Sequence, residues 1–81
     1  MTDEEIAKIV IQSLASVVPE LDEATLSPTK NLRDQLDIDS MDFLNFVIAL
    51  HDALKVDIPE RDYAQLASIA NAVRYLAGKI K

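Results

Sequence analysis

The sequence has no cysteine, and it has only one glycine, three prolines and one histidine among its 81 residues. Without cysteine the chain can form neither a disulfide framework nor a thiolate metal site. The scarcity of glycine and proline, together with a hydrophobic share of 49%, argues against a disordered or collagen-like chain. We therefore expect a compact, all-helical protein.

Long apolar runs are missing as well. The first residues, MTDEEIAKIV, lack the basic start and apolar stretch of a signal peptide, and no segment approaches the roughly 18 apolar residues of a membrane span. We therefore expect a soluble, cytoplasmic protein. A chain of this length buries only about 60–65% of its unfolded surface, so residues 1–81 are expected to form a single domain with one modest core.

Basic residues are outnumbered, with 8 Lys and Arg against 14 Asp and Glu and a net charge of −6. Such a charge repels nucleic acids and anionic membranes and favours partners with basic surfaces. The acids are concentrated in the first half, where residues 1–42 hold ten of them. The densest block consists of Asp34, Asp37, Asp39 and Asp42.

The first helix is marked at both ends. Thr2 and Glu5 fit a capping box, in which each side chain satisfies a free backbone N–H, and Pro19 opposes continuation. Apolar residues recur at helical spacing in between, which predicts a helix over about 3–18. Residues 19–38 lose this periodicity and are interpreted as a long loop, a feature that is often functional. Isolated leucines are expected to fix the loop to the core: Leu21, Leu26, Leu32 and Leu36.

Asp39 can cap a second helix that begins with Ser40 and ends near residue 54. As the first helical residue, the serine is expected to be exposed. This helix is more apolar than a surface helix usually is. One helical face carries Met41, Leu44, Val47, Ile48 and Leu54, and the arc is widened by Phe43, Phe46 and Leu50.

A turn over residues 55–59 leads to a short third helix over 60–66, and Ser68 is a suitable N-cap for a last helix that carries core residues as far as Ile80. The predicted fold class is therefore all-α. We expect a four-helix bundle with a long first loop and a short third helix.

Catalytic and metal sites find little support in these residues. The one histidine, His51, follows Ser40 by eleven residues on the same predicted helix, which separates them by about 16 Å, so it cannot activate the serine as a nucleophile. Asp37 and Asp39 could begin an EF-hand calcium loop, but Asp42 would then occupy the position that requires glycine. Neither a zinc cluster nor a glycine-rich phosphate loop is present. We expect no enzymatic activity.

The pair Asp39-Ser40 has two interpretations. Aspartate and serine are common at helix starts, so the pair can be a helix cap and nothing more. The alternative is a functional serine, and it is favoured by a combination of features. A long loop, an Asp-Ser-Met triplet at a helix start and an unusually apolar helix occur together in an acidic domain without a catalytic set.

The segment DSMDFLNFVIALHDALKVDIPE, residues 39–60, resembles the acyl carrier proteins, whose second helix begins with an Asp-Ser-Leu triplet and is followed by Ile-Pro and an acid. The similarity resumes at SIANAVRYL and covers essentially the whole chain. The resemblance implies the acyl-carrier type of four-helix bundle. It also implies that a phosphopantetheinyl transferase attaches 4′-phosphopantetheine covalently to Ser40, and that the thiol of this arm carries acyl groups as thioesters.

The resemblance further implies which residues surround this site. Asp39 and Met41 are expected next to the cofactor. Residues expected to contact partner enzymes are Asp37, Asp42, Phe43, Asn45 and Phe46. The partners are acyl-loading and acyl-processing enzymes with basic docking surfaces, and the carrier itself is expected to be a monomer.

The second helix departs from that of the fatty-acid carriers. Past Ser40 it has only Asp42 and Asp52 as acids, where those carriers have a row of glutamates. We interpret this as the mark of a dedicated pathway, for a specialised lipid, a polyketide or an aminoacyl group. The alternative from another class is a non-carrier helical interaction module whose apolar excess forms a docking or dimer surface.

Overall fold

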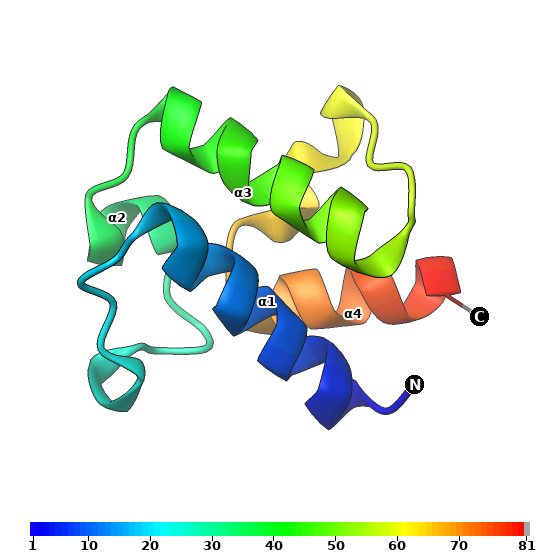
Figure 1. The fold of residues 1–81 in the computed structure, drawn as a ribbon, viewed down its shortest axis with the longest axis horizontal. Helices are drawn as coiled ribbons and strands as arrows, with labels where there is room; N and C mark the ends of the chain where they lie inside the picture. The colour runs from blue at the N-terminus through cyan, green and yellow to red at the C-terminus, as the bar shows by residue number, and fades with distance from the viewer. Residues whose placement is uncertain (81) are drawn as a thin grey trace.

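The computed structural model describes residues 1–80 and contains helices but no strand in that range. Three long helices, α1 (Asp3–Val17), α3 (Ser40–Leu54) and α4 (Ile69–Ile80), enclose one hydrophobic core (Figure 1). The fourth is a 3₁₀ helix of 7 residues, η2 (Glu60–Leu66), between α3 and α4. The all-α class, the four-helix arrangement and the short third helix are therefore confirmed.

The capping box at the start of α1 is present as predicted. The Thr2 hydroxyl accepts a hydrogen bond from the Glu5 N–H at 3.2 Å, and the Glu5 carboxylate accepts one from the Thr2 N–H at 2.9 Å. The backbone hydrogen bond from Thr2 lowers the pKa of Glu5. The helix ends at Val17, one residue before the predicted end, because the chain turns toward Pro19.

The segment over residues 19–38 is not a plain loop, and that prediction is corrected. It contains a 3₁₀ turn, η1 (Glu23–Thr25), and a five-residue helix, α2 (Leu32–Leu36). Each begins at a side-chain cap, Asp22 for η1 and Asn31 for α2. Helices this short are held by caps and tertiary contacts, and they are too short to show apolar periodicity.

α2 is fixed in place by its leucines and by one amide side chain. Leu32 is fully buried, and Leu36 packs against the core. The Gln35 side chain accepts from the Ser27 N–H and donates to the Ser27 carbonyl, both at 2.9 Å, and also donates to the Lys30 carbonyl. This small helix therefore has a defined position, one short connection before the start of α3 (Figure 1).

α3 buries only one of its two apolar faces. Phe46, Val47 and Leu50 lie in the core, where α1 packs against both α3 and α4. Met41, Leu44 and Ile48 are 67%, 40% and 48% exposed. The sequence placed these three residues on one helical face with Val47, but the neighbouring elements cover the Phe46 side and leave the Met41 side open.

Ser68 caps α4 as predicted, since its hydroxyl accepts a hydrogen bond from the Asn71 N–H at 3.2 Å. One polar contact joins η2 to this helix: the Tyr75 hydroxyl donates to the Asp62 carboxylate at 2.6 Å. The pKa of Tyr75 is raised to about 12; partial burial is the largest cause, and this hydrogen bond is the second. Within residues 1–80, none of the helices combines the length and the hydropathy that crossing a bilayer requires.

Candidate functional site

Ser40 is the first residue of α3, and its side chain is exposed. The residue before it, Asp39, is extended and caps the helix, because its carboxylate accepts the Asp42 N–H at 2.8 Å. The Asp39 carbonyl accepts the first intrahelical bond, from Phe43, at 3.0 Å. The predicted cap and the predicted exposure of the serine are both confirmed.

The approach to Ser40 is tightly defined. Asp37 ends α2 in the left-handed region, with φ 52°, which aspartate tolerates better than most residues. Ile38 follows and is buried, with 7% of its surface exposed. Because the chain is anchored at Leu32 and again at Ile38, the serine hydroxyl is presented at a fixed point between α2 and α3.

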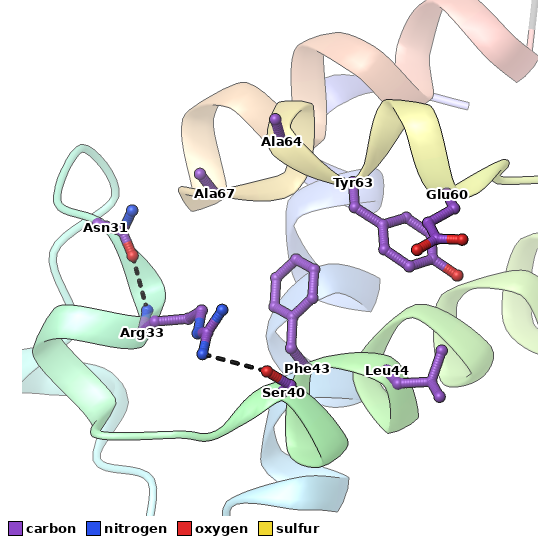
Figure 2. A pocket seen from close by; sticks show the side chains of 9 residues that line it. All are labelled: Asn31, Arg33, Ser40, Phe43, Leu44, Glu60, Tyr63, Ala64 and Ala67. Atoms are coloured by element: carbon purple, nitrogen blue, oxygen red, sulfur yellow. Dashed lines mark hydrogen bonds between the residues drawn. The ribbon is translucent and has the colours of Figure 1, made fainter.

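A basic side chain reaches this hydroxyl. Figure 2 shows Arg33 extending from α2 toward Ser40, with its Nη2 donating to the serine Oγ at 3.4 Å. The aspartates of this region stand out in the sequence, whereas the arginine beside the serine does not. The arginine could be placed beside the serine only once α2 was known to be a helix.

A cavity of about 510 Å³ opens beside Ser40, between α3 and η2 (Figure 2). Its walls are apolar and come from Phe43, Leu44, Tyr63 and two alanines. Polar groups lie toward its edges, with Asn31, Arg33 and Ser40 on one side and Glu60 on the other (Figure 2). A group attached to the serine therefore has apolar surface within reach.

Phe43 connects the cavity wall to the core through two aromatic contacts. The Phe43 ring lies 5.9 Å from that of Phe46 and 6.1 Å from that of Tyr63, centroid to centroid, in tilted and edge-on arrangements. Phe46 is fully buried. The prediction that it contacts partner enzymes is wrong, because a side chain without exposed surface cannot meet a docked protein. Phe43 is half-buried and faces the cavity.

The other predicted site residues cluster around the start of α3. Asp37, Met41 and Asn45 are exposed, and Asp42 is half-buried. Leu44 and Ile48 are exposed next to these residues, although they were not among the residues expected to contact partners. The signal was available, because residues 41, 44 and 48 recur at helical spacing on a helix that already had a second apolar face.

His51 lies on the exposed side of α3 and does not line the cavity beside Ser40. Its Nδ1 is 2.7 Å from the Val56 carbonyl, so this nitrogen is the protonated one, and 3.9 Å from the Asp57 carboxylate. Among residues 1–80, no three His, Asp or Glu side chains are grouped as metal ligands would be.

The residues around Ser40 fit an attached phosphodiester. The N-terminus of a 15-residue helix carries partial positive charge, Arg33 adds a full positive charge, and the hydroxyl is open to solvent. The apolar cavity adds room for whatever the attached group carries.

Comparison with known proteins agrees with this geometry. The family model described as "Phosphopantetheine attachment site" matches residues 8–76. The acyl carrier protein of Myxococcus xanthus is 33% identical over 72 residues, which cover 85% of this chain and 91% of that protein.

Two solved structures are similar in fold. A chain described as an acyl carrier protein from Anaplasma phagocytophilum has a TM-score of 0.87 at 28% identity and covers 100% of this chain and 94% of its own. The acyl carrier protein from Enterococcus faecalis has a TM-score of 0.72 at 26% identity and covers 98% of this chain and 99% of its own. The chain therefore belongs to the acyl carrier protein family, and its cofactor is covalent 4′-phosphopantetheine.

Proposed function

We propose that Ser40 is the residue to which 4′-phosphopantetheine is attached. The observation that carries this proposal is its exposed hydroxyl at the start of α3, beside Arg33 and at the edge of the cavity. Helix N-termini favour phosphate groups, because their free N–H groups and dipole face the anion. Once attached, the arm supplies a terminal thiol that holds an acyl group as a thioester.

Other serines are less suitable as attachment points. Ser13 and Ser68 are buried, and Ser68 also caps α4. The Ser16 hydroxyl donates to the Ser13 carbonyl at 2.6 Å within α1. The transferase cannot reach the two buried hydroxyls, and the hydroxyl of Ser16 is engaged within its own helix, so Ser40 is favoured over these.

The chain's part in this function is to present the arm, and the catalysis is supplied by its partners. The acyl carrier family implies a phosphopantetheinyl transferase and acyl-processing enzymes as those partners. In our proposal residues 1–81 act as one carrier domain and as a monomer. The cytoplasmic location stays a prediction.

We propose that partners dock on the start and the exposed face of α3. Asp37, Asp42 and Asn45 supply polar and negative groups there, and Met41, Leu44 and Ile48 supply an exposed apolar strip. We call these six residues the docking face. A surface of this kind fits a partner with an apolar patch bordered by basic residues, because charges at the rim steer association and apolar contact stabilises the complex.

The composition of α3 supports a dedicated pathway over general fatty-acid synthesis. Its exposed face carries Met41, Leu44 and Ile48, while Asp42 and Asp52 are its only acids. A partner that recognises this carrier therefore needs more apolar and less basic surface than a partner of a glutamate-lined helix. The cargo in this proposal is an intermediate of a specialised lipid, a polyketide or an aminoacyl pathway.

Intact mass after incubation with coenzyme A and a broad-specificity phosphopantetheinyl transferase tests the attachment site. We expect a gain of one phosphopantetheine group in the wild type and no gain in Ser40→Ala. Ser16→Ala is the matched control, since it removes an exposed serine elsewhere and should be modified like the wild type. Absence of any gain in the wild type would contradict the proposal and favour the interaction module.

A further inference from the structure

The four aspartates around Ser40 pose an electrostatic problem for an attached phosphodiester. Asp34, Asp37, Asp39 and Asp42 all lie within six residues of the serine, and each repels another negative group. Arg33 is the one basic residue among the described residues that line the adjoining cavity. Its place beside the serine suggests a role that the aspartates cannot fill.

Arg33 is not engaged by the acids around it. Within residues 1–80 the one acid–base contact of ion-pair length joins His51 to Asp57, at 3.9 Å, so none of the nearby carboxylates lies within ion-pair distance of the guanidinium of Arg33. Instead its Nη2 reaches the Ser40 hydroxyl at 3.4 Å (Figure 2). A hydroxyl is a weak partner for a cation, and the guanidinium has five N–H donors, most of which remain free in this arrangement.

We infer that Arg33 binds the phosphate of the group attached to Ser40. The inference rests on the proposed attachment site. The non-ester oxygens of a phosphodiester are bonded to the phosphorus and so lie two bonds beyond Oγ, within reach of a guanidinium that already contacts Oγ. Arginine matches this geometry particularly well, because its planar fork can donate two parallel hydrogen bonds to one phosphate.

The backbone around Arg33 is held in place by several contacts. Its own N–H is bonded to the cap residue Asn31 at 2.9 Å, and the preceding Leu32 is fully buried. Gln35 ties the same short helix to the preceding loop. With the backbone of Arg33 held in this way, only its side chain must be ordered to hold the phosphate beside the cavity.

A thermodynamic cycle on the intact protein tests the inference. Melting temperatures are measured for the unmodified and the phosphopantetheinylated forms of the wild type and of Arg33→Gln. If Arg33 has a purely structural role, the substitution lowers the melting temperatures of both forms equally. If Arg33 contacts the phosphate, the substitution lowers the melting temperature of the modified form more. We expect the difference between modified and unmodified forms to fall by about 2–4 °C in Arg33→Gln at low salt.

Controls separate this contact from a general loss of charge. Arg74→Gln removes one positive charge from an exposed position on α4. It should leave the difference in melting temperature between the modified and unmodified forms unchanged. Arg33→Lys should recover part of it, since it keeps the charge and loses the planar fork. High salt should reduce the effect of Arg33→Gln, because it screens exposed charges.

A second measurement needs no variant. In the wild type, attachment of the arm should shift the Arg33 Nε–H resonance and slow its exchange with water, and the Arg74 Nε–H should not respond. The inference would be overturned if the Arg33 Nε–H resonance did not change on modification and Arg33→Gln lowered the melting temperatures of both forms equally. The attachment site would still stand in that case. If the wild type accepts no group in the mass assay, the attachment site fails first, and this inference fails with it.

Discussion

At the scale of single residues, polar contacts fix how the small elements join. The hydrogen bond between Tyr75 and Asp62 connects α4 to η2, the 3₁₀ helix that forms one side of the cavity. A neutral phenol donates this bond, and partial burial also favours the neutral form. The raised pKa of Tyr75, about 12, is therefore linked to the stability of the fold.

Tyr75→Phe should destabilise the protein by about 1 kcal/mol near neutral pH, the usual net value of a hydrogen bond. Because the folded-state pKa of Tyr75 is raised above its ordinary 10.0 to about 12, the stability that it contributes is fully present below pH 10 and is lost as the pH rises toward 12. Urea unfolding at several pH values measures this as a difference between wild type and variant.

Tyr63→Phe is the matched control, since it removes a hydroxyl from η2 without touching the Asp62 bond. We expect it to follow the wild type through the same pH range. A wild type and a Tyr75→Phe variant whose difference in unfolding free energy stays constant up to pH 12 would contradict the linkage.

Backbone conformation at single residues also limits stability. Lys55 closes α3 in the left-handed region with φ 57°, where a side chain is disfavoured and glycine is not. Its side chain is exposed. Lys55→Gly should therefore stabilise the protein by about 0.5–1 kcal/mol, measured as a higher midpoint in urea with an unchanged slope.

A glycine placed inside the helix, instead of after its end, serves as the control. Ala53→Gly places glycine at an exposed position inside α3 and should cost about 1 kcal/mol. Opposite signs for the two variants are expected. A loss of stability in Lys55→Gly would show that the αL residue is not strained.

At the scale of elements, α3 serves two purposes with its two apolar faces. Phe46, Val47 and Leu50 hold the helix in the core, while Met41 and Ile48 lie open to solvent. A helix that is apolar on most of its surface is normally buried on most of its surface. Here α1 packs against the core side of α3 and Tyr63 of η2 packs against Phe43, so the second face remains available to partners.

A pair of substitutions distinguishes the faces. Leu50→Ala should destabilise the protein by about 2–5 kcal/mol, because it leaves a cavity in the core. Ile48→Gln should change stability by less than about 0.5 kcal/mol, since nearly half of Ile48 is already exposed. Chemical denaturation of both variants measures these values, and a large loss in Ile48→Gln would contradict the exposed position of this side chain.

At the scale of the whole molecule, the fold gathers charge near one site. The chain has a net charge of −6, and the aspartates that precede and begin α3 stand next to the candidate attachment serine. Such a field attracts basic partners and weakens as salt is added. The docking face therefore combines steering by charge with apolar contact.

Asp42→Lys should lower the kcat/KM of the phosphopantetheinyl transferase by about tenfold at low salt, and by less at high salt, because it reverses charge beside Ser40. Asp52→Lys is the control: it changes the net charge equally but lies near the far end of α3. Initial rates of modification for both variants measure the effect. Equal rates of modification for the two variants would show that the negative charge near Ser40 does not contribute to recognition by the transferase.

The sequence was most informative where a signal is local and repeated. The start of α1 followed from Thr2 and Glu5, and the bounds of α3 followed from the Asp39 cap and the apolar run behind it, because caps and periodicity depend on neighbours along the chain. α2 was missed because a five-residue helix shows no period. The sequence did not decide which apolar face of α3 packs against the core, since two apolar faces look alike until the positions of the packing helices are known.

For the candidate site, the sequence by itself determined the serine, its capping aspartate, the acidic surroundings and, through a family resemblance, the cofactor. Only the tertiary structure decided that Phe46 is buried, that Leu44 and Ile48 are exposed, and that Arg33 reaches the Ser40 hydroxyl. The physical reason is the range of the interactions. Helix caps are formed within a few residues along the chain, whereas burial and the approach of an arginine to a serine depend on how separate helices pack against each other.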